Sequence, residues 1–257
     1  MLLTLILEKF SLKGKAALVT GSSRGLGAAM AVALAEAGAD VALHGSRAVP
    51  ESTRQRLNGT GGNHLALVGN VSQASVCSSL IEQVVEHFGT IDILVNNAGI
   101  IRRAPALEHS EEDWQAVMDT NLSSVFRLTK HAGKYMLARG SGKVINIASL
   151  LTFQGGVLVP SYAAAKGGVG QLTKAFANEW AARGVNVNAI APGYMETDNT
   201  RALRADPVRS RQIVERIPAG RWGCPEDLAG AVVFLASSAS DYVHGHVLVV
   251  DGGWLSR

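Results

Sequence analysis

The chain lacks most of the features that mark secreted, nucleic-acid-binding and membrane proteins. Its 257 residues include only two cysteines, Cys77 and Cys224, which form neither a CxxC pair nor a disulfide framework. The net charge is only +3, and the 24 basic residues are scattered among 21 acidic ones without a basic block, which argues against nucleic acid as a partner. The apolar opening MLLTLILEKF has no basic leader or cleavage site and is too short to span a bilayer. We therefore expect a cytoplasmic protein without a membrane partner, and we interpret the opening as the lead-in to the first strand.

Several catalytic motifs are also missing. HExxH is absent, and His244 and His246 have no third ligand at suitable spacing, so we expect no metal site. No GxSxG motif surrounds a serine nucleophile. No GK[ST] follows the glycine-rich turn, which disfavours hydrolysis of a nucleoside triphosphate.

What the chain does contain is a regular alternation of short apolar runs with longer segments of helical period. Hydrophobic residues make up 47% and charged residues 18%, and no linker divides the chain. This pattern predicts one α/β domain over residues 1–257, of the doubly wound Rossmann type, with a seven-stranded, mostly parallel sheet and helices on both faces. The predicted strands are 16–20, 40–44, 64–68, 91–95, 143–148, 185–190 and 246–250. The predicted helices are 24–37, 72–88, 110–139, 161–183 and 225–237, with at most a short helix after the second strand.

The segment TGSSRGLG lies between the first predicted strand and the first predicted helix. Gly21, Gly25 and Gly27 permit a tight turn and a close approach of the backbone to a pyrophosphate at the helix N-terminus. A glycine-rich turn alone is weak support, but this placement favours a dinucleotide site. The next strand ends in HGSR, without the acid that bonds the ribose 2′-hydroxyl of NAD. Ser46 and Arg47, together with Arg24, can instead bind a 2′-phosphate, so we expect NADP or NAD with NADP favoured.

Tyr162 and Lys166 stand four residues apart on one predicted helix face, and Ser149 ends an apolar run before them. An ammonium held beside a phenol favours the phenolate, so the pair is predicted to act as a general acid and base near neutral pH. The alternative is an ordinary pair on a solvated face. NNAG, residues 96–99, follows the fourth strand and is interpreted as a floor for the adenosine half of the cofactor. Asn121 stands unfavourably inside a predicted helix and is interpreted as holding a water.

With these motifs in this order, and with APG at residues 191–193, the chain resembles the short-chain dehydrogenase/reductase family from residue 12 to residue 254. The resemblance implies that Tyr162 exchanges the hydroxyl proton, Lys166 lowers its pKa and bonds the nicotinamide ribose, Ser149 orients the reacting oxygen, and Asn121 keeps a relay water. Asn70 stands where the family usually has Asp, which is a departure at the adenine. The cofactor contacts that the turns and the resemblance together imply are Gly21, Ser23, Arg24, Gly25, Leu26, Gly27, Ser46, Arg47, Asn70, Val71, Asn97, Ala98, Gly99, Tyr162, Lys166, Pro192, Gly193, Met195 and Thr197.

Further strings, including NNAGIIRR, TFQGG, PGYMETDNT and RIPAGRWG, resemble the branch of the family that oxidises deoxy sugar acids such as 2-deoxy-D-gluconate at carbon 3 or 2-dehydro-3-deoxy-D-gluconate at carbon 5. A sugar-acid carboxylate would be bound by arginine. The residues that we expect at the substrate are Arg102, Arg103, Gln154, Arg201 and Arg204, and residues 193–222 are predicted to form a substrate lid.

Three alternatives remain open at this point. They are a gluconate 5-dehydrogenase, a 3-ketoacyl carrier-protein reductase, and a binding module that senses dinucleotide without catalysis. The complete set of Asn, Ser, Tyr and Lys favours an enzyme. Gly167, Gly168 and Gly170 cost helix stability unless something packs against them. By resemblance, we expect this helix to pair between subunits of a homotetramer.

Overall fold

The computed structural model describes residues 5–257, in which seven strands form one wholly parallel sheet. The seven-stranded sheet is confirmed, and it contains no antiparallel pair. The strand order is β3-β2-β1-β4-β5-β6-β7, so the order reverses between β1 and β4, where such sheets bind ligands at the carboxyl ends of their strands. The strands are β1 Ala16–Val19, β2 Asp40–Gly45, β3 His64–Val68, β4 Ile93–Asn96, β5 Gly142–Ile147, β6 Val185–Pro192 and β7 Val247–Val250.

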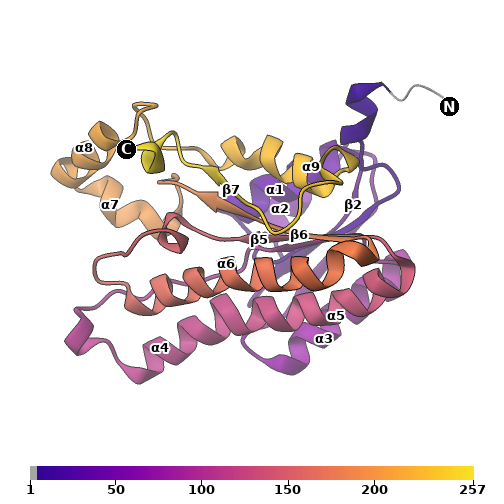
Figure 1. The fold of residues 1–257 in the computed structure, drawn as a ribbon, viewed down its shortest axis with the longest axis horizontal. Helices are drawn as coiled ribbons and strands as arrows, with labels where there is room; N and C mark the ends of the chain where they lie inside the picture. The colour runs from indigo at the N-terminus through magenta and orange to yellow at the C-terminus, as the bar shows by residue number, and fades with distance from the viewer. Residues whose placement is uncertain (1–4) are drawn as a thin grey trace.

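Helices cover both faces of the sheet (Figure 1). One face carries α1, α2 and α9, and the other carries α3, α5 and α6. The helices are α1 Gly25–Glu36, α2 Glu51–Leu57, α3 Ala74–Phe88, α4 Glu111–Met118, α5 Ser124–Arg139, α6 Pro160–Trp180, α7 Arg201–Ala205, α8 Pro207–Arg216 and α9 Ala229–Ala236. The short α2 confirms the weak helical pattern after the second strand.

Adjacent residues of each central strand point into two separate cores. Leu18 of β1 packs in the core under α3 and α5, whereas Val19 packs in the core under α1 and α9. Both side chains are fully buried, because helices cover both faces. This explains why the strands appear in the sequence as continuous apolar runs rather than as an alternating pattern.

The predicted helix over residues 110–139 is confirmed as a continuous helical segment, residues 111–139, but it is not α-helical throughout. One turn of π-helix at Asp119–Ser123 lies between α4 and α5. Ser110 caps α4 by accepting a hydrogen bond from the Asp113 amide at 3.1 Å. The π-turn contains Asn121, the residue whose mid-helix position was already unfavourable, and such turns are frequent at functional sites.

The first described helix and the C-terminus lie away from the centre of the sheet (Figure 1). The predicted lead-in forms a 3-10 helix at Ile6–Phe10, and residues 1–4 lie outside the described part. In residues 5–257, no helix combines the length and the apolar character needed to cross a membrane.

The predicted lid segment, residues 193–222, contains the short helices α7 and α8. Ile213 and Ile217 are buried beside Trp222 and Trp254, so a small core separate from the main two anchors this segment. The ring centroids of Tyr194 and Trp254 lie 4.5 Å apart. The base of the segment is therefore packed, while most of α7 and α8 remains exposed. The role of this segment as a lid stays a prediction.

Candidate active site

A cleft of about 970 Å³ lies at the carboxyl ends of the strands. Every residue that we expected at the cofactor lines this cleft, from Gly21 in the first turn to Thr197 beyond β6. Ser149, Tyr162 and Lys166 line it too. Additional lining residues that sequence reasoning did not select are His44, Ser72, Ile100, Ala116, Asp119, Thr120, Ile147, Ala148, Glu196, Asp198, Asn199, Thr200 and Pro225.

The glycine-rich turn has the close packing that its sequence predicts. Gly21 has φ +65°, a left-handed conformation that favours glycine. A Cβ on Gly27 would lie 2.3 Å from the Gly21 carbonyl oxygen, so this position has no room for a side chain. Helix α1 begins at Gly25 and opens its amide groups toward the cleft, which provides a site for the negative charge of a pyrophosphate. The residues therefore fit a dinucleotide.

The floor of the cleft joins the ends of β1 and β4. Thr20 Oγ1 accepts hydrogen bonds from the amides of Asn97 and Ala98 at 3.0 and 3.1 Å. The Asn97 carboxamide donates to the carbonyls of Thr20 and Gly21 at 2.8 and 3.0 Å. These bonds explain why two amides follow the apolar run of β4, and they fix the turn that we predicted beneath the adenosine half.

The end of β2 presents Ser46 and Arg47, both exposed, and no carboxylate. Arg24 is also exposed, but its Nε lies 2.7 Å from an oxygen of Asp198 beyond β6. This ion pair leaves Arg47 as the better placed group for a 2′-phosphate, because it has no such acidic partner within 4.0 Å among the described residues.

The groups that we predict to exchange the proton all line the cleft. Ser149 follows β5, while Tyr162 and Lys166 lie on the first turns of α6, which begins with proline at its first position. Burial raises the pKa of Tyr162 above its ordinary value, while a hydrogen bond with Ser149 and the positive charge of Arg103 act to lower this pKa. Burial lowers the pKa of Lys166 to about 8.

The expectation that Lys166 lowers the pKa of Tyr162 stays a prediction, because the ammonium does not hydrogen-bond the Tyr162 hydroxyl in this structure. Lys166 Nζ donates to the carbonyl oxygen of Ile147 and lies 5.6 Å from the centre of the Tyr162 ring. Helical spacing places both groups on one face, but spacing alone does not specify which acceptor the ammonium binds. The groups that favour the Tyr162 phenolate here are Ser149 and Arg103.

Asn121 is fully buried and does not line the cleft. Its Oδ1 accepts from the Ile100 amide and its Nδ2 donates to the Ile100 carbonyl, both at 2.8 Å. The side chain therefore fixes the loop after NNAG, and Ile100 itself lines the cleft. A role in holding a water stays a prediction. In the structure, the Asn121 side-chain amide hydrogen-bonds the backbone of Ile100.

The candidate substrate residues separate into two groups. Arg102 and Arg204 line the cleft, whereas Arg103, Gln154 and Arg201 do not. Gln154 instead accepts from the Trp254 indole at 3.3 Å, and Arg201 pairs with Asp198. Arg103 Nη2 donates to the Asn199 carbonyl at 3.0 Å, yet its charge reaches Tyr162.

The candidate arginines also differ in whether a carboxylate lies beside the guanidinium. Arg102 Nε lies 2.9 Å from Asp113, and Arg204 lies 3.6 Å from Glu196. For Arg103, no carboxylate lies within 4.0 Å among the described residues. Sequence alone could not make this distinction, because the neighbours of Arg103 come from distant segments.

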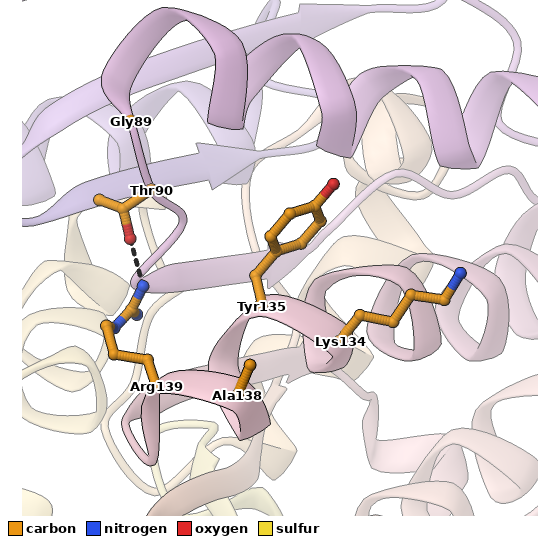
Figure 2. A pocket seen from close by; sticks show the side chains of 6 residues that line it. All are labelled: Gly89, Thr90, Lys134, Tyr135, Ala138 and Arg139. Carbon is orange, nitrogen blue, oxygen red and sulfur yellow. Dashed lines mark hydrogen bonds between the residues drawn. The ribbon is translucent and has the colours of Figure 1, made fainter.

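A second, shallower pocket of about 510 Å³ lies at the opposite edge of the sheet, before β4 and β5 (Figure 2). Arg139 bonds Thr90 there and also donates to the Ile91 carbonyl and to Asp92, at 3.1 and 3.0 Å. Its guanidinium thus ties α5 to the start of β4. None of the predicted site residues lines this pocket. Nor do residues 5–257 contain a group of three or more His, Cys, Asp or Glu side chains arranged to hold a metal.

The fold and the cleft define an α/β oxidoreductase with a dinucleotide site, and comparison with known proteins agrees. The family model described as enoyl-(acyl carrier protein) reductase matches residues 21–255. The chain belongs to the short-chain dehydrogenase/reductase family.

Relatives of known name cover nearly the whole chain. A 2-dehydro-3-deoxy-D-gluconate 5-dehydrogenase of Escherichia coli is 54% identical over 98% of this chain and 100% of its own length. An enzyme of the same name from Bacillus subtilis is 53% identical, over 97% of this chain and 98% of its own length. The crystal structure of a gluconate 5-dehydrogenase from Burkholderia cenocepacia, in complex with NADP and tartrate, is 42% identical with a TM-score of 0.92, and the match covers 98% of this chain and all of that one.

Proposed function

We propose that this oxidoreductase interconverts the carbon-5 alcohol and ketone of 2-dehydro-3-deoxy-D-gluconate with NADP as cofactor. The observation that carries the proposal is the cleft, which brings Ser149, Tyr162 and Lys166 to the same wall as the predicted nicotinamide contacts. The substrate is supported by the relatives of that name, which are 53–54% identical over nearly the whole chain.

Tyr162 is the group that exchanges the proton of the substrate hydroxyl. When bound, the nicotinamide cofactor gives or accepts the hydride. During oxidation the Tyr162 phenolate takes the hydroxyl proton, and during reduction the phenol returns it to the carbonyl oxygen. Ser149 hydrogen-bonds Tyr162 and orients the reacting oxygen beside it. Lys166, buried at the same wall, would hold the ribose next to the nicotinamide.

Arg103 is our candidate for binding the substrate carboxylate. It has no acidic partner within 4.0 Å among the described residues, and its charge is felt at Tyr162. A carboxylate that binds it would therefore be held within reach of the reacting centre. The 5-dehydrogenase relatives act on a sugar acid by name, and the solved gluconate 5-dehydrogenase contains tartrate, another carboxylic acid.

The test is a spectrophotometric panel of hydroxy and keto sugar acids with NADP(H) and NAD(H). We expect the highest kcat/KM for 2-dehydro-3-deoxy-D-gluconate, with lower values for gluconate and for 2-deoxy-D-gluconate. A gluconate 5-dehydrogenase would reverse the order of the first two. Turnover of acetoacetyl thioesters at a comparable kcat/KM would identify a ketoacyl reductase instead. Binding of the cofactor without turnover of any acid would indicate a binding module that senses dinucleotide.

We also propose a homotetramer in the cytoplasm. Within the chain, Gly168 and Gly170 pack against Leu122 and Thr152, but a Cβ on Gly167 would meet nothing within 4 Å. Phe126 is 44% exposed on the neighbouring α5. A second subunit would explain both features. Two unpaired cysteines suit a reducing compartment.

Light scattering tests the assembly. We expect a tetramer for the wild type and a smaller species for Phe126→Asp. Val68→Asp is the matched control, since Val68 is similarly exposed, at 45%, but lies on the edge strand β3. A monomeric wild type would contradict the tetramer.

A further inference from the structure

His44 is a buried histidine at the cofactor cleft whose two ring nitrogens are both used. It is the penultimate residue of β2, is 1% exposed, and lines the cleft. Its Nδ1 lies 3.1 Å from the amide nitrogen of Gly21, and its Nε2 lies 2.8 Å from the carbonyl oxygen of Gly69. Apolar packing of the core does not explain a histidine at this position, and the proposed proton exchange at Tyr162 does not use it.

The partners of His44 determine its tautomer. A backbone amide can only donate and a backbone carbonyl can only accept, so Nδ1 must be unprotonated while Nε2 carries the hydrogen. Both hydrogen bonds exist together only in this neutral form. Burial lowers the pKa of His44, which favours the neutral imidazole.

Each partner begins a segment that lines the cleft. Gly21 opens the glycine-rich turn, of which residues 23–27 line the cleft, and Gly69 directly precedes Asn70, Val71 and Ser72 at the end of β3. His44 itself precedes Ser46 and Arg47 by two and three residues. One imidazole ring therefore connects the ends of β1, β2 and β3.

Hydrogen bonds tie the glycine-rich turn to His44, so the turn cannot shift unless the His44 ring shifts with it. The Gly21 carbonyl accepts from Asn97 at 3.0 Å, so Gly21 is bonded on both its amide and its carbonyl side. A second connection joins the same strands, because Ser22 Oγ accepts from the His44 amide at 2.8 Å. A small shift of Gly21 would be transmitted to Gly27, which packs against its carbonyl oxygen.

We propose that His44 is a positioning residue that holds the three loops around the adenosine half of the cofactor, and that its neutral imidazole sets the affinity for that half. The inference rests on the proposed NADP-dependent function. It assigns no part of the proton or hydride transfer to His44, which lies on β2 whereas Tyr162 lies on α6. The role is therefore separable from the chemistry by experiment.

The experiment measures dissociation constants for NADPH, by the change in its fluorescence, and for 2′,5′-ADP, which lacks the nicotinamide, by calorimetry. For His44→Leu, which removes both hydrogen bonds, we expect both constants to rise at least tenfold. We expect kcat at saturating cofactor and the KM for the sugar acid to stay within about twofold. His44→Asn offers an amide oxygen near the position of Nδ1, so it should recover a large part of the affinity by accepting from Gly21.

His64→Leu is the matched control. It makes the same chemical change on the neighbouring strand β3, where His64 contacts Thr60 Oγ1 at 3.2 Å and does not line the cleft. We expect both dissociation constants to stay at wild-type values in this variant.

Three results would overturn the inference. They are a folded His44→Leu that binds NADPH and 2′,5′-ADP as the wild type does, a His44→Asn that loses as much affinity as the leucine variant, and equal losses in kcat, substrate KM and cofactor affinity. If His44→Leu does not fold, the asparagine variant decides. A wild type that binds neither NADPH nor NADH would instead contradict the proposed function, so the two failures can be told apart.

Discussion

The ammonium of Lys166 lies 5.6 Å from the centre of the Tyr162 ring, yet its hydrogen bond goes to the Ile147 carbonyl. Lys166 is only 5% exposed, and burial lowers its pKa to about 8. The protein therefore holds a buried cation at the wall of the cleft at a cost to its own stability. Such a cost is common where a charge serves function.

Replacing Lys166 by methionine should separate stability from activity. The pKa falls from 10.5 to about 8, which at about 1.36 kcal/mol per pH unit corresponds to roughly 3 kcal/mol of destabilisation below pH 8. Part of this gain is offset by the hydrogen bond that Ile147 loses, so Lys166→Met should raise the free energy of unfolding at pH 7 by about 1 to 3 kcal/mol. Activity should be lost. Urea unfolding measures the first effect and turnover the second.

The sign of the pH dependence provides a control for this variant. Between pH 8 and pH 10.5, the unfolded wild type binds more protons at this lysine than the folded one, so the Lys166 contribution makes the wild type more stable as pH rises. This rise should be missing in Lys166→Met. A variant that is less stable than the wild type at pH 7 would contradict the account.

The two directions of the reaction should respond oppositely to pH. Oxidation requires the Tyr162 phenolate, so its kcat/KM should rise as pH rises through the Tyr162 pKa, whereas reduction requires the phenol and should fall. Since the charge of Arg103 acts to lower this pKa, Arg103→Met should move both profiles to higher pH. Arg209→Met, an exposed change on α8, is the control. Profiles that do not move in Arg103→Met would exclude the electrostatic role of Arg103.

Arg47 should determine the preference for NADP. A charge-assisted hydrogen bond is worth about 1.5 to 3 kcal/mol, so Arg47→Ala should raise the KM for NADP by roughly ten- to a hundredfold and leave the KM for NAD nearly unchanged. Arg54→Ala on α2 is the control, because Arg54 is 57% exposed and pairs with its helix neighbour Glu51 at 3.6 Å. Equal losses with both cofactors would show that Arg47 does not contact the 2′-phosphate.

Asn121 should matter for stability through Ile100. Asn121→Ala leaves the amide and the carbonyl of Ile100 without their partners, which we expect to lower the free energy of unfolding by about 2 kcal/mol. Because Ile100 lines the cleft, KM should rise as well. Asn58→Ala, an exposed change at the end of α2, should stay within about 0.5 kcal/mol of the wild type. An Asn121→Ala variant as stable as this control would show that the hydrogen bonds contribute little.

The sequence predicted most of what depends on local pattern. The strands are apolar runs because both faces of the sheet are covered, and the motifs follow those runs, so their meeting at one edge could be inferred from Gly21, Asn97 and Ser149 alone. The strand order seen in the structure then shows which of these loops lie next to each other.

The sequence did not predict what depends on partners from distant segments. Asp198 pairs with Arg24 across the cleft, and Ile147 accepts from Lys166, although neither pair is close in sequence. In the sequence, His44 is simply part of HGSR, whose one evident feature is that it has no acid at the end of the second strand. Its role depends on Gly21 and Gly69, which lie 23 and 25 residues away.

The most direct test of the account is the Tyr162→Phe variant, which keeps the ring and removes the hydroxyl. We expect its affinity for NADPH to match that of the wild type, while turnover of 2-dehydro-3-deoxy-D-gluconate falls by about a hundredfold or more. Turnover at the wild-type rate in a variant that binds NADPH normally would show that Tyr162 does not exchange the substrate proton.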